Sequence, residues 1–525
     1  MRNFFLPGRS PVYAAHAAAA TSHPMSTLVA LEVLRSGGNA VDAGVAAVAV
    51  QCVVDPLMTG IGGDCFALYA PKGRATPIAI NGSGRSPAAA EVSWYRENKV
   101  AITQHSPHAV MVPGAIGAWA QLVRDHGTRS LGDALQPAIK LAEEGYLVQS
   151  RVAWDWNRNA HIVAEDPDSA RAYLVDGKAP AAGARMRFPR LAATLRLIAE
   201  RGAAGFYEGA VAADIVAKLR SLGGLHTLED FACARPDYVT PVSTDYRGYQ
   251  VFECPPNGQG LAALMMLNVL SGYDIGAMPD TDRIHLYAEA SKQVYLHRNA
   301  LFGDPSQVEV PVEYLLSQEW AARARDRIDP TRAQSPVLLT EKPHKDTIYL
   351  CVVDRDGNSL SLINSLFEAF GSGILAPESG VMLNNRGFSF NFEQGHPNCI
   401  APGKRPMNTI IPGMLMRDGE AVAPFGVMGG HYQAMGHVDL LTGIIDRGLD
   451  VQQALDAPRS FGHDDVLDLE QTIPADVEAE LKRRGHTIGR PIIPLGSGQI
   501  IWRDKATGSL IAGSDCRKDG NAAGY

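Results

Sequence analysis

Thr347 is the residue of this chain whose type and setting could do covalent chemistry. It opens the segment 347–365, which is typical of two β-strands joined by a tight turn, and Gly357 suits the left-handed last position of a hairpin loop. With the loop centred on Asp356, Thr347 falls opposite Ser365, and side chains that face each other across a hairpin lie within hydrogen-bond reach. We therefore predict that the hydroxyl groups of Thr347 and Ser365 meet.

The residues before Thr347 indicate how its hydroxyl could become a nucleophile. Residues 329–346 hold three prolines and many polar side chains, a composition typical of an exposed segment that is open to cleavage. A cut between Asp346 and Thr347 would give Thr347 a free α-amine, whose pKa of about 7.7–8.0 lets it take the proton of its own hydroxyl. The simpler interpretation is a buried strand threonine, which β-branching alone favours.

A pair of glycines, Gly429 and Gly430, lies between a predicted strand at 421–427 and a predicted helix at 431–446. Turn formation alone can explain such a pair. Backbone N–H groups at a strand-to-helix turn can also stabilise a developing negative oxygen, and glycine lets a substrate come close. The pair is therefore a candidate oxyanion hole.

Metal and cofactor chemistry is not expected from the sequence. His431 and His437 are six positions apart, a spacing that does not put two ligands on one face of a helix, so we interpret them as polar helix residues. The seven cysteines are scattered and have no C-x-x-C spacing, which disfavours a disulfide framework or a zinc site and favours a reducing cytoplasm. The N-terminus lacks the continuous apolar run of a secretion signal.

Composition excludes several classes of partner. The chain has 525 residues, is 46% hydrophobic and 20% charged, and carries a formal net charge of −8. It has no basic run and no interleaved aromatic patch, so nucleic acid is not expected as a partner. The most apolar run, 40–54, contains Asp42 and Gln51 and is too short to span a bilayer, so no membrane partner is expected either.

The order of predicted elements indicates a mixed α/β chain in which helices dominate before Thr347 and strands after it. Predicted helices span 25–35, 40–54, 119–125, 131–144, 191–201, 211–222, 260–271, 285–301, 431–446 and 477–484. Predicted strands span 65–69, 347–354, 359–366, 381–383, 409–416, 421–427, 500–502 and 509–512. No segment repeats with a period of about 20–50 residues, so a solenoid is excluded.

A series of short motifs, in a shared order over most of the chain, resembles the γ-glutamyltranspeptidase (glutathione hydrolase) family of N-terminal-nucleophile hydrolases, closer to its acylase and amidohydrolase members. The motifs are G-G-N-A-V-D-A (37–43), G-I-G-G-D (60–64), V-P-G-A (112–115), G-D-P (303–305), V-V-D and D-G-N (352–354 and 356–358), E-S-G-V-M-L-N-N (378–385), K-R-P (404–406) and M-G-G (428–430).

The resemblance implies a four-layer αββα sandwich and a precursor that cleaves itself before Thr347. Segments 1–346 and 347–525 would then be the large and small subunits of one folded unit, a heterodimer that could itself pair. Thr347 would be the nucleophile, Ser365 would stand where the family has a supporting threonine, and Gly429 and Gly430 would form the oxyanion hole.

The positions that depart from the family pattern concern the substrate. Asn408 and Thr409 stand where the family has two substrate-contacting serines. Ser83 stands for the arginine that holds the α-carboxylate of a γ-glutamyl group, and Arg85 lies two residues further on. Ser389 stands for the aspartate that holds the α-amine of that group. Phe367 stands for an asparagine and Arg386 for a glutamine. A charged group in such a site needs a partner, so the γ-glutamyl zwitterion is disfavoured, and Arg386 could hold a carboxylate presented differently.

The sequence therefore predicts a self-cleaving amide hydrolase that acts on a small-molecule amide. Two substrate classes stay open: γ-glutamyl amides such as glutathione, and small carboxylate-bearing acyl amides of the oxamate or glutaryl type. The replaced clamp favours the second class. An alternative of another kind is a binding protein that keeps the fold without turnover, which the presence of Thr347, Ser365 and the glycine pair argues against.

Overall fold

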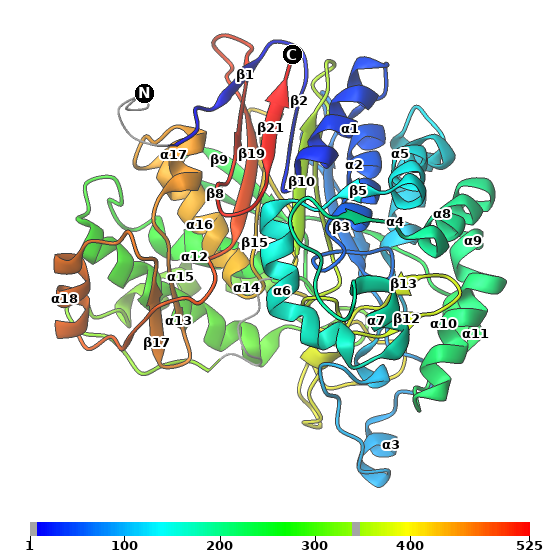
Figure 1. Cartoon of the computed structure of the whole chain (residues 1–525). Helices are drawn as coiled ribbons and strands as arrows, with labels where there is room; N and C mark the ends of the chain where they lie inside the picture. Colours follow the sequence, from blue (N-terminus) through cyan, green and yellow to red (C-terminus); the bar gives the residue numbers. More distant parts are fainter. Residues whose placement is uncertain (1–7, 339–346) are drawn as a thin grey trace.

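The computed structural model describes residues 8–338 and 347–525, and in these ranges two seven-stranded antiparallel sheets lie face to face (Figure 1). One sheet has the order β1 (Val12–Ala14), β20 (Leu510–Ser514), β19 (Ser497–Arg503), β15 (Glu420–Met428), β14 (Gly413–Arg417), β9 (Tyr249–Glu253) and β8 (Val242–Tyr246). The other has the order β21 (Asn521–Gly524), β2 (Ala18–Thr21), β10 (Ile348–Val353), β11 (Ser359–Ser365), β3 (Asp64–Ala70), β4 (Ile78–Gly82) and β7 (Asp237–Val239).

A layer of helices covers the outer face of each sheet, which gives the predicted αββα arrangement (Figure 1). The sheet with β10 carries α1 (Pro24–Arg35), α2 (Ala40–Val54), α4 (Ala115–His126), α5 (Leu131–Glu144) and α8 (Pro189–Arg201). The sheet with β15 carries α12 (Gly260–Leu270), α13 (Asp280–Leu301), α15 (Gln318–Asp326), α16 (Tyr432–Ile445) and α17 (Val451–Asp456).

Strand β10 contributes side chains to two hydrophobic cores, one between its sheet and the helices and one between the two sheets. Ile348 and Leu350 pack among the helices, whereas Tyr349 and Cys351 pack against the other sheet, because successive side chains of a strand point to opposite faces. Every residue of β10 and β11 is buried. The hairpin is therefore central to the fold on both faces.

The hairpin register is the predicted one. Ile348 pairs with Asn364, which sets Thr347 opposite Ser365. The loop closes through a hydrogen bond from the Gly357 N–H to the Asp354 carbonyl, 3.0 Å long, and Gly357 has a φ of 87°. This positive φ is the conformation for which glycine was predicted there.

The G-G-N-A-V-D-A motif is the start of α2. Asn39 caps the helix, and Asp42 returns the bond by accepting from the Asn39 N–H at 2.9 Å. The Asp42 carboxylate also accepts from the N–H and the hydroxyl of Thr128 at 3.0 and 2.6 Å, and from the Arg129 N–H at 3.2 Å. Gly44 lies so close to β11 that an added Cβ would sit 2.2 Å from a methyl carbon of Leu360.

Smaller elements complete the described chain, and a three-stranded sheet of β16, β17 and β18 lies beside α13. They are η1 (Pro107–Ala109), η2 (Arg386–Ser389), α3 (Val92–Glu97), α6 (Ser150–Ala164), α7 (Pro167–Tyr173), α9 (Ala204–Tyr207), α10 (Ala210–Ser221), α11 (Leu228–Ala232), α14 (Val312–Leu315), α18 (Ala475–Arg483), β5 (Tyr146–Leu147), β6 (Arg185–Met186), β12 (Leu375–Ala376), β13 (Val381–Met382), β16 (Ser460–His463), β17 (Val466–Leu469) and β18 (Ile488–Gly489).

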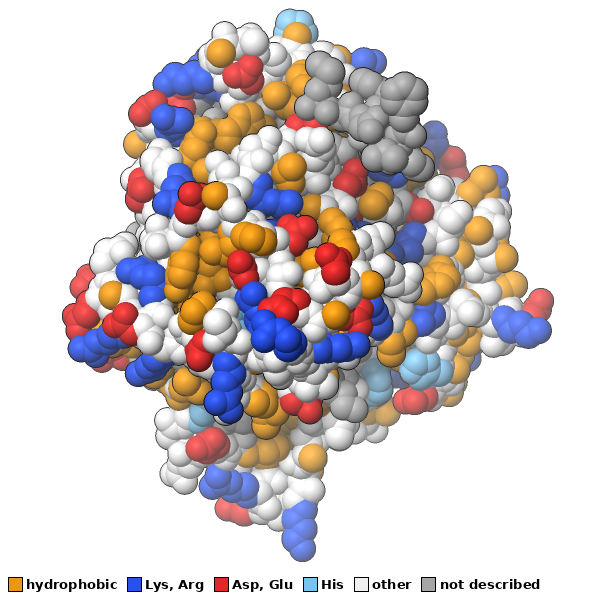
Figure 2. Space-filling model, turned by 90° about the vertical axis from the view of Figure 1, so that its left-hand side faces the viewer, with side chains coloured by type: hydrophobic (Ala, Val, Ile, Leu, Met, Phe, Trp, Pro, Cys, Tyr) orange, Lys and Arg blue, Asp and Glu red, His pale blue; other side chains and the backbone are white. Residues whose placement is uncertain are grey.

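Within residues 8–338 and 347–525, no helix is long and apolar enough to cross a bilayer. On the face shown in Figure 2, lysine and arginine side chains are interspersed with aspartate and glutamate side chains. The seven cysteines all lie in the described ranges as free thiols.

We expect Asp42→Ala to lower the free energy of unfolding by about 2–4 kcal/mol, because the variant loses a helix cap and leaves three partly buried N–H groups, of Asn39, Thr128 and Arg129, without their acceptor. Asp133 has the same capping role in α5 but is exposed, so Asp133→Ala should cost only about 1 kcal/mol. Urea denaturation of both variants measures the difference. Equal losses would show that the Asp42 contacts to Thr128 and Arg129 contribute nothing.

Candidate active site

Thr347 and Ser365 form the centre of the candidate site. Both side chains are fully buried, and Thr347 Oγ1 lies 3.2 Å from Ser365 Oγ, as the hairpin register predicts. The Phe367 N–H donates to Ser365 Oγ at 2.9 Å. Asp346 lies outside the described residues.

The G-I-G-G-D motif brings an acidic residue to this pair. Ser365 pairs with Asp64 across β11 and β3. Gly63 packs directly on the hairpin, because an added Cβ would sit 2.2 Å from the Ser365 carbonyl oxygen. The glycines therefore allow the close approach that places Asp64 beside the hydroxyl pair.

Arg386 and Asp64 form a fully buried ion pair, with Arg386 Nε 2.9 Å from Asp64 Oδ2. Arg386 Nη1 donates to Thr409 Oγ1 at 3.1 Å, and the guanidinium carbon lies 4.1 Å from the centre of the Phe367 ring. The same Asp64 oxygen accepts from Asn408 Nδ2 at 3.1 Å. Five of the positions singled out from the sequence thus meet around the pair of Asp64 and Arg386: Ser365, Phe367, Asn408, Thr409 and Arg386 itself.

Sequence reasoning did not single out Asp64. It named Arg386 as a cation for a substrate carboxylate, but the protein already supplies one carboxylate to Arg386. The available signal was a single acidic residue between a glycine-rich turn and the apolar strand residues that follow it. Because buried charges occur in pairs, a predicted buried arginine calls for a search for its partner.

Ser83 and Ser389, the serines that the resemblance sets at the charged-clamp positions, bond to the protein's own backbone and amide groups. The hydroxyl of Ser389 donates to the carbonyl oxygens of Arg386 and Met407, at 3.0 and 2.9 Å. The hydroxyl of Ser83 donates to Asn81 Oδ1 at 2.7 Å. Their substrate contacts stay a prediction.

Arg85 lies apart from the Asp64 pair. It forms ion pairs with Asp237 at 3.1 Å and Asp304 at 3.3 Å, and its side chain is 34% exposed. It lines a cavity of about 270 Å³ together with Ser83 and Gly84. Gly84 donates its N–H to Asp64 at 2.7 Å, so this cavity adjoins the candidate site from the side of β4.

The glycine pair ends β15 in a conformation that other residues avoid. Gly429 has a φ of 130° and Gly430 a φ of 59°. One side chain, Gln259, holds this turn to the rest of the site, because its Nε2 donates to the Gly430 and Thr409 carbonyl oxygens, each at 2.9 Å. Sequence reasoning missed Gln259, whose partners come from two distant segments.

Packing between the sheets brings the glycine pair and Thr347 to the same end. Gly426 of β15 lies under Tyr349, since an added Cβ would sit 2.5 Å from the ring. The Ser361 hydroxyl, opposite Cys351, donates to the Phe425 carbonyl at 3.3 Å. Towards the N-terminal end of β10, which leads to Thr347, the neighbouring residues of β15 come closer to Gly429. Thr347 and the glycine pair therefore lie at the same end of the two sheets.

The histidines near this turn are not surface residues of a helix. His431 and His437 are both fully buried. His431 Nδ1 accepts from Arg298 Nη1 at 2.8 Å, and the same nitrogen of Arg298 donates to Gln259 Oε1 at 2.8 Å. His437 pairs with Glu253 at 2.6 Å. The prediction of polar helix residues missed this burial, because their partners come from the distant elements α13 and β9.

Glu368, next to Phe367, is a titratable group beside the site that sequence reasoning missed. Burial raises its pKa, while hydrogen bonds from Asn385 and Gln104 and the charge of Arg386 oppose that rise. Its carboxylate accepts from Asn385 Nδ2 at 2.7 Å and Gln104 Nε2 at 2.8 Å. Glu368 thus fixes the residue before Arg386.

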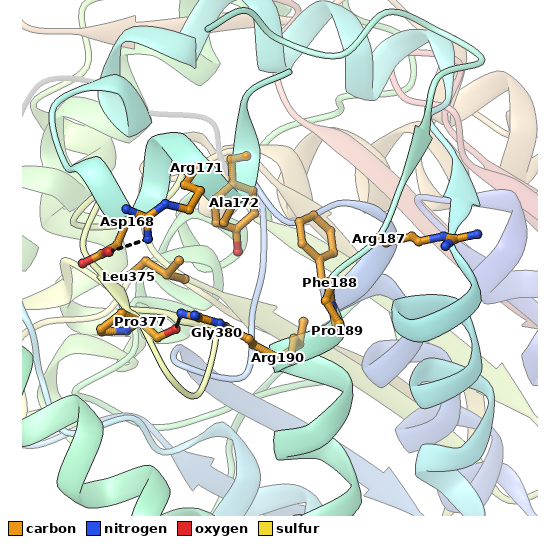
Figure 3. Close-up of a pocket in the computed structure, with 12 residues that line it drawn as sticks. Asp168, Arg171, Ala172, Arg187, Phe188, Pro189, Arg190, Leu375, Pro377 and Gly380 are labelled. Atoms are coloured by element: carbon orange, nitrogen blue, oxygen red, sulfur yellow. Dashed lines mark hydrogen bonds and ion pairs between the residues drawn. The ribbon is translucent and has the colours of Figure 1, made fainter. Parts of the chain in front are cut away.

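A cavity of about 230 Å³ elsewhere on the surface is a separate feature (Figure 3). Tyr173, Phe188 and Leu375 give it an apolar lining, and Arg171 at its rim pairs with Asp168. Arg187 points away from the other labelled side chains in Figure 3. None of the predicted site residues lines it, so it does not define the candidate site.

Comparison with known proteins identifies the family. A model of the gamma-glutamyltranspeptidase family matches residues 26–525. The chain is 34% identical over 514 residues to the glutathione hydrolase-like YwrD proenzyme of Bacillus subtilis (strain 168), covering 96% of this chain and 97% of that protein. It is 32% identical over 526 residues to the oxamate amidohydrolase proenzyme of Klebsiella pneumoniae, covering 97% and 98%. The crystal structure of a cephalosporin acylase from Bacillus halodurans matches with a TM-score of 0.93 and 39% identity, covering 100% of this chain and 99% of that one.

The fold and these matches define the class as the αββα sandwich of the N-terminal-nucleophile hydrolases. Within that class, the chain belongs to the γ-glutamyltranspeptidase family, as its motifs predicted.

We expect Asp64→Asn and Arg386→Met each to destabilise the protein by about 3–5 kcal/mol, because each leaves a buried charge without its partner. The double variant should lose clearly less than the sum, since it buries no unmatched charge. As a control, the same cycle on the partly exposed Arg85–Asp237 pair should give a coupling below about 1 kcal/mol. Additive losses at Asp64 and Arg386 in urea denaturation would contradict an energetic coupling between them.

Proposed function

We propose that the chain is a precursor that cuts itself between Asp346 and Thr347 and then acts as an amide hydrolase. The observation that carries this proposal is the buried contact between the Thr347 and Ser365 hydroxyls directly after the proposed cut. Family membership supports it, because relatives in the family are named as hydrolase and acylase proenzymes.

The reaction follows from the groups at hand. The free α-amine of Thr347 takes the proton of the Thr347 hydroxyl, and Oγ1 attacks the amide carbonyl carbon. The N–H groups of Gly429 and Gly430 stabilise the oxygen that becomes negative. The carbonyl re-forms as the amine leaves with the proton, and the acyl group stays on Oγ1 as an ester. Water attacks the ester by the same route and releases the acid.

The fold supports a cut that leaves the fragments together. Strand β10 pairs with β2, and β11 pairs with β3, so strands after the cut lie between strands that precede it. Fragments 1–346 and 347–525 would therefore remain one heterodimer, and a pair of such heterodimers is its proposed assembly. The free thiols support a reducing, cytoplasmic location.

For the substrate, we propose a small acyl amide whose acyl group ends in a carboxylate, held by Arg386. Ser83 and Ser389 offer no charge, and their hydroxyls already bond within the protein. A second candidate, the γ-glutamyl amides, is favoured by Asp64, because its carboxylate could take an α-ammonium group while Arg386 takes the α-carboxylate. The two candidates therefore differ in the charge of the acyl group: the first carries one carboxylate, and the second carries a carboxylate and an ammonium group.

We expect the purified protein to run as two fragments on a denaturing gel, with the smaller one starting at Thr347. Thr347→Ala should remain one chain because the attacking hydroxyl is gone, whereas Thr347→Ser should still be cut. N-terminal sequencing of the small fragment checks the position. A different first residue would refute the assignment of Thr347, and an uncut native chain would favour the binding-protein alternative.

We expect glutaryl-p-nitroanilide to be hydrolysed with a kcat/KM at least about tenfold above that of γ-glutamyl-p-nitroanilide. Arg386→Ala should lower kcat/KM for the glutaryl substrate by at least about a hundredfold, because the substrate carboxylate loses its partner. A neutral butyryl amide should suffer much less and serves as the control. If γ-glutamyl-p-nitroanilide is the better substrate and Asp64→Asn removes that preference, the second candidate replaces the first.

A further inference from the structure

Two histidines and a glutamate meet far from Thr347, between α13 and the segment after α18. His285 and Glu289 lie one turn apart on the same face of α13, and His486 follows α18. All three side chains are buried, and one ligand atom from each lies within 4.8 Å of the other two. The proposed function uses none of them.

The hydrogen bonds of His285 fix which nitrogen carries a lone pair. His285 Nε2 lies 2.8 Å from the Asp329 carbonyl oxygen, which can only accept, so the proton of His285 is on Nε2. Its Nδ1 lone pair faces His486 Nε2 at 2.8 Å. A backbone carbonyl on the far nitrogen is the partner that usually orients a metal-binding histidine.

The third group is a carboxylate held in place by the same region. Glu289 Oε2 accepts from the Gln334 N–H at 3.1 Å, and Glu289 Oε1 accepts from Lys292 Nζ at 2.7 Å. Lys292 also donates to the Gln334 carbonyl at 2.9 Å. An ion at Oε1 would displace Lys292 from that oxygen and leave it bonded to Gln334.

We infer that His285 Nδ1, His486 Nε2 and a carboxylate oxygen of Glu289 form a binding site for a divalent transition metal of the Zn²⁺ type. Two histidines and one glutamate are an established ligand set for Zn²⁺. The two nitrogens need to move from 2.8 Å to about 3.3 Å apart to bind one tetrahedral ion. No proton is lost, because His486 moves its proton from Nε2 to Nδ1.

The site has a route for the ion and a structural consequence. His486 and Lys292 line a cavity of about 110 Å³. His285 and Glu289 precede the proposed cut and His486 follows it, so a bound ion would cross-link the two fragments. Only this cross-link depends on the proposed function, because binding itself requires the fold alone.

The test is a titration of the full, chelator-treated protein with ZnCl₂ by calorimetry, together with thermal unfolding. We expect about one Zn²⁺ per chain and a raised Tm, because an ion that binds only the folded state stabilises it. The uncut Thr347→Ala chain should bind equally well, which separates this inference from the proposed cleavage. Absence of stoichiometric binding in the native protein would overturn the inference.

Variants locate the ion. His486→Ala and His285→Ala should each weaken binding by at least about a hundredfold, and Lys292→Met should tighten it by about tenfold because a competing cation is removed. His297→Gln, on the same helix, and His463→Gln, on the same cavity, are matched controls that should bind as the native chain does. Lys292→Met keeps the test valid if a histidine variant fails to fold. Unchanged binding in both histidine variants, weaker or unchanged binding in Lys292→Met, or loss in His463→Gln, would overturn the assignment.

Discussion

The pairing of β10 and β11 between β2 and β3 is the constraint on which the candidate site depends. Sheet hydrogen bonds fix both strands on both edges, and packing fixes them on both faces. The Thr347 hydroxyl directly precedes such a strand, so its place is set by many cooperative bonds rather than by a loop. A catalytic group gains most from this kind of support, since small displacements reduce rates strongly.

The charged groups near that hydroxyl are buried and are each held by several contacts. The buried pair of Asp64 and Arg386 is tied to β3, to η2 and to the segment that carries Thr409. Gln259 then ties the Thr409 segment to the glycine turn. Because each partner is buried, a change at one member leaves another without its match.

The sequence predicted those features that depend on interactions between residues close together in the chain. The hairpin register followed from one loop and two strands, and the helices of 40–54 and 131–144 were predicted with the bounds that they have. It did not predict features that depend on contacts between residues far apart in the chain. The Ala18–Thr21 segment is a strand despite its three alanines, because sheet pairing overrides a weak propensity. The sequence analysis missed Asp64, Gln259 and the burial of His431 for the same reason: their roles depend on contacts that only the finished fold creates.

The pairing of strands from distant parts of the sequence carries a consequence for the timing of maturation. Strand β1 pairs with β20, and β2 pairs with β21, so each sheet joins residues of 12–21 to residues of 510–524 (Figure 1). Neither sheet is therefore complete until these two segments have folded onto each other, and until then β2 has an open edge. A self-cleavage that needs the finished sandwich, as proposed above, would follow this step rather than precede it.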